Sequence, residues 1–303
     1  MDFQVIKTAT KKLKQYLVSN VNHQCQLCHC DTPLSQQWVC TTCERELPFS
    51  PAACITCAAP LKSSSDRQCG QCLINPPAID HLITCFDYLY PINKWLPAFK
   101  FSRQTALAPW LANHLANSII NRLYNNIDQN TPNGFENQNL KTKALTKKNP
   151  LENGLTINNL KKNKLAKINL KNSNLKKSYL ENHLPLMPEA IIAVPLHGKR
   201  LKQRGYNQSE LIAKQLSRLL GIPLLTDAVI RTKKTEAQSG LSLKQRQSNI
   251  LQAFQVSQNL PTHIALVDDV FTTGSTLNEL SRQLKLAGCE FTQGWVIAHA
   301  PLA

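Results

Sequence analysis

The sequence contains no run of apolar residues approaching the ~18 that a membrane-spanning helix requires. The N-terminal stretch MDFQVIKTATKKLKQYLVSN also lacks the uninterrupted apolar region of an export signal. Together these absences argue against a transmembrane helix and predict a cytoplasmic protein. Acidic residues are scarce as well, since 19 Asp and Glu stand against 35 Lys and Arg, for a formal net charge of +16. A surplus of this kind is typical of proteins that bind nucleic acid.

Nearly half of that surplus lies in one low-complexity segment. Residues 125–183 contain eleven Lys against four acidic residues, which gives the segment a charge of +7. The segment alternates Asn, Lys and Leu without a sustained helical stripe, so it cannot offset the entropy of ordering by burial. We predict a disordered insert, with a transient helix around 160–180 as the second interpretation. A basic arm that binds a partner is the third, because charge runs are usually solvated.

At 303 residues the chain is long enough for two domains, on a prior of roughly 150 residues each. After an N-terminal helix in residues 1–24, the pattern alternates strands with helices, which indicates an α/β domain with a mostly parallel sheet. Ligand sites in such sheets lie at the carboxyl ends of strands, here after Val194 and Val267. The expected strands are 82–90, 190–195, 224–230, 252–256, 263–267 and 291–298, and the expected helices are 92–101, 105–124, 207–220 and 275–287.

The eleven cysteines are too regular and too many to be incidental. An odd count without an export signal argues against disulfides. Eight of them form four C-x-x-C pairs: Cys25 and Cys28, Cys40 and Cys43, Cys54 and Cys57, Cys69 and Cys72. Eleven residues separate the two pairs in each half, so the second half repeats the first at an offset of 29.

Two C-x-x-C turns suffice to close one tetrahedral zinc site with no open position. The repeat therefore predicts a double zinc ribbon in residues 25–78 with two structural zinc ions. Few apolar residues lie between the pairs, so metal binding worth about 10–16 kcal/mol per site would supply most of the folding energy. Redox-active pairs are the alternative. Cys30 is a competing ligand that breaks the repeat, Cys85 and Cys289 are expected in the core, and His23 and His29 are taken as bystanders.

The segment HIALVDDVFTTGSTLNEL carries the strongest chemical signal. An apolar strand ends in Asp268 and Asp269, passes through hydroxyl residues, and opens a helix. A helix N-terminus offers free N–H groups, so the loop is suited to wrap a phosphate. Adjacent carboxylates suit the vicinal hydroxyls of a ribose, or a Mg²⁺ carried with a polyphosphate. The plainer interpretation is a helix cap, but a cap needs one hydroxyl residue and the loop offers four, Thr272, Thr273, Ser275 and Thr276. Gly274 among them lets the backbone come close to the ligand.

A second basic segment follows the expected strand 190–195. Lys199, Arg200, Lys202 and Arg204 precede a helix expected to begin near Asn207. Basic residues at the end of a parallel strand are placed to receive a diphosphate, and Arg binds two oxygens at once. Without the neighbouring phosphate loop, a solvated basic loop would be the better interpretation.

These motifs resemble known families. The loop at 268–276 is similar to the signature of type I phosphoribosyltransferases, and VPLHGKRLKQRGYNQ resembles the diagnostic segment of ComF proteins, a family named for competence. The resemblance covers about residues 24–124 and 188–300 and is interrupted by the insert. It implies that residues 79–303 form a phosphoribosyltransferase-like domain. A third segment matches a mobile hood that closes over the ligand; its matching residues are Gln238, Leu243, Arg246 and Asn249.

The resemblance implies that the protein binds phosphoribosyl diphosphate with Mg²⁺ and serves the uptake or handling of single-stranded DNA with other competence proteins. By resemblance Asp268 and Asp269 contact the ribose hydroxyls and Thr272 to Thr276 the 5′-phosphate. Arg200 and Arg204, with Arg246 of the hood segment, are the further residues expected to bind the ligand. No residue identifies itself as a general base, so catalysis of transfer is left open. The alternatives are a nucleic-acid-binding adaptor that senses nucleotides, with Trp38 as its stacking residue, and a nucleotide-salvage phosphoribosyltransferase.

Overall fold

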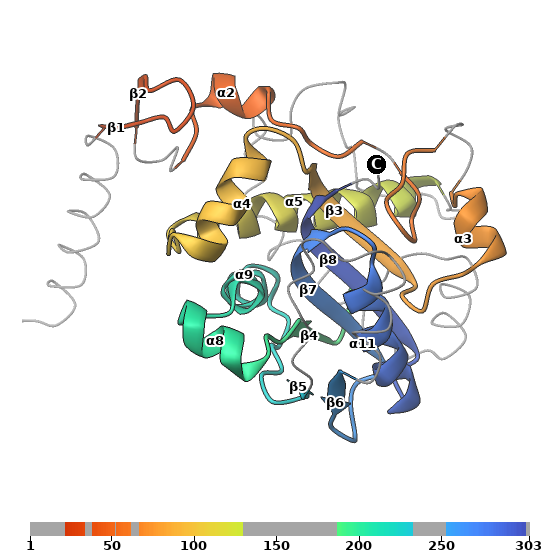
Figure 1. The fold of residues 1–303 in the computed structure, drawn as a ribbon. Coiled ribbons are helices and arrows are strands. Elements are labelled where there is room, and N and C mark those ends of the chain that lie inside the picture. The colour runs from red at the N-terminus through yellow and green to blue at the C-terminus, as the bar shows by residue number, and fades with distance from the viewer. Residues whose placement is uncertain are drawn as a thin grey trace, which may run out of the picture.

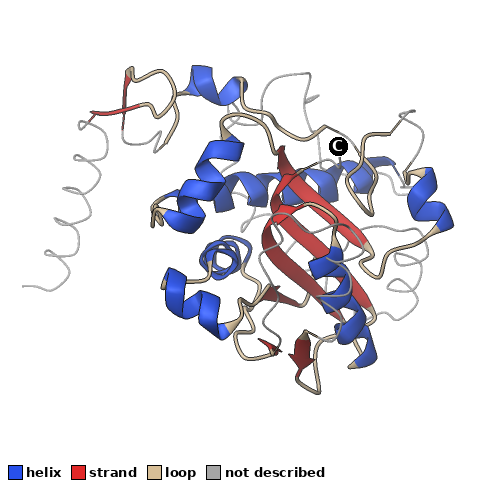
Figure 2. Cartoon of the chain, in the orientation of Figure 1, coloured by secondary structure: helices blue, strands red, loops and turns tan. Residues whose placement is uncertain are grey.

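A parallel β-sheet forms the centre of the protein in a computed structural model that describes residues 22–33, 38–51, 53–61, 67–129, 187–232 and 253–300. The predicted α/β fold is confirmed, and the strands are drawn in red in Figure 2. All three neighbouring strand pairs are parallel. Across the sheet the order is β3 (His81–Asp87), β8 (Phe291–His299), β7 (His263–Phe271) and β4 (Ala190–Ala193).

Helices cover both faces of the sheet, which is why its strands are apolar runs rather than alternating ones. One face packs against α4 (Ile92–Phe101), α5 (Leu107–Gln129) and α9 (Gln208–Leu220). The other face packs against α11 (Ser275–Leu286), which lies in front of the sheet in Figure 1 while α5 runs behind it. The expected helices are therefore present close to their predicted bounds.

Alternate side chains of each strand enter the two cores, as the period of two requires. On β7, Ala265 and Val267 pack with the α5 and α9 core, whereas Ile264 and Leu266 pack with the α11 core. Trp295 of β8 is fully buried in the first of these cores. The central strands are thus fixed from both sides, and their carboxyl ends form a rigid edge.

The strand order reverses between β4 and β7. After β4 the chain passes through α9, and Leu224 then bridges Ile191 on the outer side of β4. After β7 the chain passes through α11 and returns on the opposite side, as β8. In open α/β sheets a ligand crevice forms where the order reverses, outside the carboxyl ends of the two strands. The topology therefore points to the ends of β4 and β7.

Two local features differ from the sequence expectation. Strands β5 (Val229–Arg231) and β6 (Phe254–Val256) pair with each other in a separate antiparallel ribbon. The basic segment forms a short helix, α8 (Gly198–Arg204), where a loop was expected. His197 caps this helix by accepting a hydrogen bond from Lys199 N, and Gly205 ends it in the left-handed conformation (φ 86°).

The first ribbon (residues 22–47) contains β1 (Asn22–Gln24), β2 (Asp31–Pro33) and α2 (Thr41–Arg45), and the second ribbon (residues 53–74) ends in α3 (Gly70–Ile74). The segment between them pairs with the edge of β3, through a bridge between Phe49 and Phe86. The predicted double ribbon is thus present, and its halves pack on opposite faces of the sheet.

Several predicted features fall outside the described residues. They are most of the N-terminal helix in 1–24, the insert from 130 onward, and the hood segment that contains Gln238, Leu243, Arg246 and Asn249. The backbone of α5 is described to Gln129, past the expected start of the insert at 125. No helix in the described part of the chain is long and apolar enough to cross a membrane.

Candidate functional site

The eight repeated cysteines form two four-cysteine clusters. In each cluster the Sγ atoms all lie within 4.8 Å of one another. The first cluster comprises Cys25, Cys28, Cys40 and Cys43, and the second comprises Cys54, Cys57, Cys69 and Cys72. Four thiol ligands at this spacing form the donor set of a closed tetrahedral zinc site. Zinc would hold the two ends of each ribbon together and supply no open coordination position.

The repeat is visible in the hydrogen bonds that orient the thiols. Cys40 N donates to Cys25 Sγ at 3.3 Å, and Cys69 N donates to Cys54 Sγ at the same distance. In both ribbons the residue after the first C-x-x-C pair has a φ of 58°. Its N–H donates to the carbonyl oxygen of the pair's first cysteine, which turns the two thiols toward one centre. The two ribbons, which repeat in sequence at an offset of 29 residues, therefore also repeat the same backbone turn.

The thiols of each cluster differ in how readily they ionise. Burial opposes ionisation of Cys25 and Cys54, yet backbone N–H groups outweigh burial and lower their pKa values to about 6 and about 7. Burial and the nearby Cys54 charge raise the pKa of Cys57 to about 12. Burial also raises the pKa of Cys43 and Cys72. A bound cation would relieve this repulsion, so the clusters fit a metal ion.

The remaining cysteines do not belong to these clusters. Cys30 is exposed, and Cys85 and Cys289 are buried in the two cores, as predicted. Burial raises the pKa of Cys85 to about 12, which keeps it a neutral core residue.

A cavity of about 310 Å³ opens at the carboxyl ends of β4 and β7. It lies where the strand order reverses. Lys199 and Lys202, which the sequence placed with the arginines to receive a diphosphate, are exposed and do not line the cavity. The other predicted pocket residues that the structure describes all line it: Arg200, Arg204, Asp268, Asp269, Thr272, Thr273, Gly274, Ser275 and Thr276. Arg246 lies outside the described residues.

Gly274 shapes the loop between β7 and α11. Its φ is 70°, and a Cβ at this position would lie 2.6 Å from Phe271 Cζ, so both conformation and space require glycine. The hydroxyls of Thr273 and Ser275 lie 2.7 Å apart. Gly274 gives the N-terminus of α11 no side-chain cap, and Ser275 and Thr276 line the cavity. The loop therefore presents N–H and hydroxyl donors to an anion.

The two acidic residues at the end of β7 have different surroundings. Asp268 Oδ1 accepts hydrogen bonds from Ser209 Oγ and from Asp269 N, both at 2.9 Å. Burial, followed by the charge of Asp269, raises the pKa of Asp268 to about 7. Asp269 is only 4% exposed. Asp268 is thus poised between its neutral and its charged form near neutral pH.

Sequence reasoning missed Lys100. This residue lies on α4, and its Nζ is 2.9 Å from Asp269 Oδ2. Burial alone would lower the pKa of Lys100, but the charge of Asp269 outweighs burial and raises it. The expected helix 92–101 contained Lys100, but a helix pattern does not say which distant strand end its side chain reaches. Tyr88, which follows β3 and lines the cavity, was detectable from the rule that carboxyl ends of parallel strands meet.

Positive charge exceeds negative charge in the cavity. Its charged lining residues are four cations against two acids: Lys100, Arg200, Arg204 and Arg231 against Asp268 and Asp269. Burial lowers the pKa of Arg231, and the charge of Arg200 lowers it further. Burial and Arg204 do the same to Arg200. A bound polyanion would offset these repulsions, whereas a neutral ligand would not.

The junction between α8 and α9 fixes the basic residues against β4. Asn207 Nδ2 donates to Val194 O at 3.0 Å, while its Oδ1 accepts from Ser209 N and caps α9. Arg204 donates to Oε1 of Gln208, the first residue of α9. Asn207 and Gln208 of the motif R-G-Y-N-Q therefore position Arg204 of the same motif, which lines the cavity.

The chain is similar to several characterised proteins, although no family model matches it. It is 31% identical to Competence protein F of Haemophilus influenzae over 92% of this chain and 98% of the relative. It is 28% identical to DNA utilization protein YhgH of Escherichia coli K12, over 91% and 96% of the two chains. Competence protein ComFC of Bacillus subtilis is 30% identical over 35% of this chain. With this extent of similarity, and with the ribbons and cavity described above, the chain belongs to the ComF family.

Proposed function

We propose that this protein binds phosphoribosyl diphosphate with Mg²⁺ and takes part in handling single-stranded DNA during DNA uptake. One observation carries the proposal. A single cavity holds a phosphate-binding loop, two carboxylates at a strand end, and a surplus of cations. These are the groups that a ribose with phosphates at both ends requires.

The loop and the acids suit different parts of that ligand. The N–H and hydroxyl groups of Thr272 to Thr276 would bind the 5′-phosphate. Asp268 and Asp269 would accept hydrogen bonds from the 2′- and 3′-hydroxyls, and Arg200 and Arg204 would bind the diphosphate. Mg²⁺ would supply charge neutralisation on the diphosphate. The buried carboxylates and the arginines provide the protein's share of that binding.

The proposal concerns binding of this ligand in the cavity, and it assigns no general base for transfer. Among the described residues that line it, the acidic groups are Asp268 and Asp269, and the proposal assigns both to ribose. Transfer would also need a group that accepts the proton of an incoming nucleophile. The DNA part of the proposal is supported by relatives that are called competence and DNA utilization proteins.

Isothermal titration calorimetry tests the ligand. We expect phosphoribosyl diphosphate to bind in the presence of Mg²⁺ and ribose 5-phosphate to bind more weakly, because the latter lacks the diphosphate. The same titration with single-stranded DNA added tests whether the protein binds both ligands at the same time. If phosphoribosyl diphosphate produces no heat of binding with Mg²⁺ present, the ligand assignment is wrong. The alternative is then that the cavity senses a different nucleotide metabolite.

A further inference from the structure

Two stretches of the chain that contribute to the cavity contain cations and no acidic residue. No Asp or Glu occurs in residues 88–127 or in 190–209. These two stretches contain α4 with its following loop, and α8 with the start of α9. We name five residues at the end of α4, in the loop after it and in α8 the α4–α8 rim: Phe101, Arg103, Lys199, Lys202 and Arg204. The rim carries four cations and an aromatic ring.

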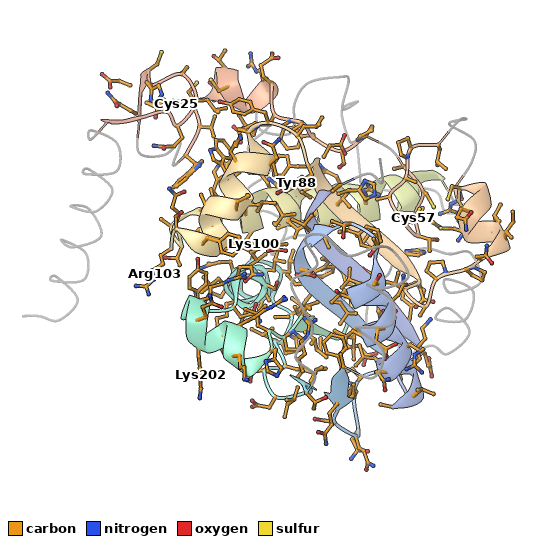
Figure 3. All side chains as sticks on the ribbon, viewed as in Figure 1. Cys25, Cys57, Tyr88, Lys100, Arg103 and Lys202 are labelled. Atoms are coloured by element: carbon orange, nitrogen blue, oxygen red, sulfur yellow. The ribbon has the colours of Figure 1, made fainter. Side chains whose placement is uncertain are left out.

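Contacts hold the two halves of the rim side by side. The Tyr206 hydroxyl, just after α8, donates a hydrogen bond to the carbonyl oxygen of Phe99 on α4. The Arg204 guanidinium lies over the Phe101 ring, 5.0 Å from its centroid. Burial raises the pKa of Tyr206, and the charges of Arg204 and Arg103 act against it, so both arginines are near the same hydroxyl. Figure 3 shows Arg103 and Lys202 projecting from the same side of the molecule.

Phe101 is unusually exposed for a large aromatic residue, at 73%. Lys199, Lys202 and Arg103 are exposed as well. Trp38, the aromatic residue that the sequence suggested for stacking, packs instead against the core beneath the first ribbon. The exposed ring with a guanidinium on it and free cations around it is therefore on the rim and not in the ribbons.

Single-stranded DNA fits this chemistry better than other anionic partners. It presents one phosphate per nucleotide together with an unpaired base whose face stacks on an aromatic ring. A DNA duplex presents the same phosphates but keeps its bases stacked inside. An acidic protein presents the charge without flat rings at regular intervals.

We propose that the α4–α8 rim is the surface that binds single-stranded DNA, with bases stacked on Phe101 and phosphates bound by Arg103, Lys199 and Lys202. Arg204 belongs both to the rim and to the cavity lining, so a bound strand lies at the cavity mouth. The inference rests on the DNA part of the proposed function. It does not depend on which phosphate ligand the cavity holds.

Fluorescence anisotropy with the full chain and a labelled oligothymidylate of about 20 nucleotides tests the stacking residue, since known sites span ~4–16 nucleotides. Phe101→Ala is expected to weaken binding at least fivefold, because base stacking is worth about 1–3 kcal/mol per base. The matched control is Leu286→Ala on α11, a side chain equally exposed at 73%. Leu286→Ala is expected to bind like the unaltered protein.

The salt dependence tests the phosphate contacts. Arg103→Gln and Lys202→Gln are each expected to lower the slope of log K against log salt concentration by about 0.7, the value for one phosphate of a single strand. Arg218→Gln removes an equal charge from the exposed end of α9 and is expected to leave the slope unchanged. Calorimetry should show phosphoribosyl diphosphate binding as before in Arg103→Gln and Lys202→Gln.

The possible outcomes distinguish an error in the rim assignment from an error in the proposed DNA-binding function. If the unaltered chain binds the oligonucleotide and all rim variants bind equally well, the rim assignment is wrong and the DNA function stands. Tighter binding of duplex DNA, or of RNA, through the same residues would overturn the choice of partner. Failure of the unaltered chain to bind any oligonucleotide would overturn both the rim and the DNA part of the proposed function.

Discussion

The two cysteine clusters and the cavity are built in opposite ways. Each cluster draws its four ligands from 19 consecutive residues, Cys25–Cys43 and Cys54–Cys72, and the turns that aim them repeat at a fixed period. The cavity draws its lining from segments as distant as Tyr88 and Leu277. A cluster is therefore a local structure that metal closes, whereas the cavity exists only when the whole sheet has assembled. The two should respond differently to removal of metal and to single substitutions.

Removal of zinc should produce the largest effect. We expect about two zinc ions per chain, and chelation should unfold the ribbons, because each site contributes about 10–16 kcal/mol. Cys25→Ser and Cys69→Ser should each retain about one zinc and lose only the ribbon that contains the substitution. Elemental analysis with limited proteolysis measures both. Less than one zinc in the unaltered chain, with no change in folding on chelation, would contradict the metal assignment.

A methyl group at Gly274 should damage the cavity and spare the clusters. Gly274→Ala places a Cβ 2.6 Å from Phe271 Cζ at a φ of 70°, which costs roughly 1–3 kcal/mol of strain. We expect weaker binding of the phosphate ligand with unchanged zinc content. Gly70→Ala in α3 is the control, because its Cβ would meet nothing within 4 Å. Equal ligand affinity in both variants would show that the loop does not hold the phosphate.

Lys100 tests whether the distant α4 belongs to the cavity. Its charge favours the ionised form of the carboxylate pair, so Lys100→Met should raise the pKa of Asp268 further. Each unit of pKa corresponds to about 1.4 kcal/mol, and ligand affinity near pH 7 should fall by up to about tenfold. The pH profile of ligand affinity should move to higher pH, and Lys100→Arg should restore it. A uniform loss at every pH would instead indicate a packing role.

The smallest effect concerns the pH dependence of stability. Because the folded protein raises the pKa of Asp268 from 3.8 to about 7, its neutral form stabilises the fold. That contribution is complete below about pH 4, the unfolded pKa, and is lost as pH rises through about 7. Asp268→Asn should therefore flatten the decline in Tm between pH 5 and 8, at about 2–4 °C per kcal/mol. The exposed Asp227→Asn serves as control, and an unchanged decline in Asp268→Asn would contradict the shift.

The contrast also explains what the sequence was able to predict. The ligands of each cluster lie within one short segment, and so do the residues from Asp268 to Thr276, so spacing and residue type were enough to identify them. Lys100 and Arg231 were missed because their role depends on where α4 and β5 lie against β7, which no local pattern encodes. The helix α8 was missed because it is short, and its end is set by a left-handed glycine, Gly205.

The central claim is that the acidic pair holds a ribose, and one substitution tests it directly. Asp269→Ala should weaken binding of phosphoribosyl diphosphate in the presence of Mg²⁺ by about 1.5–3 kcal/mol, roughly ten- to hundredfold. The same substitution removes negative charge, so affinity for single-stranded DNA should be equal or slightly higher. Calorimetry and anisotropy on one protein sample measure both. Unchanged affinity for phosphoribosyl diphosphate in Asp269→Ala would contradict the account.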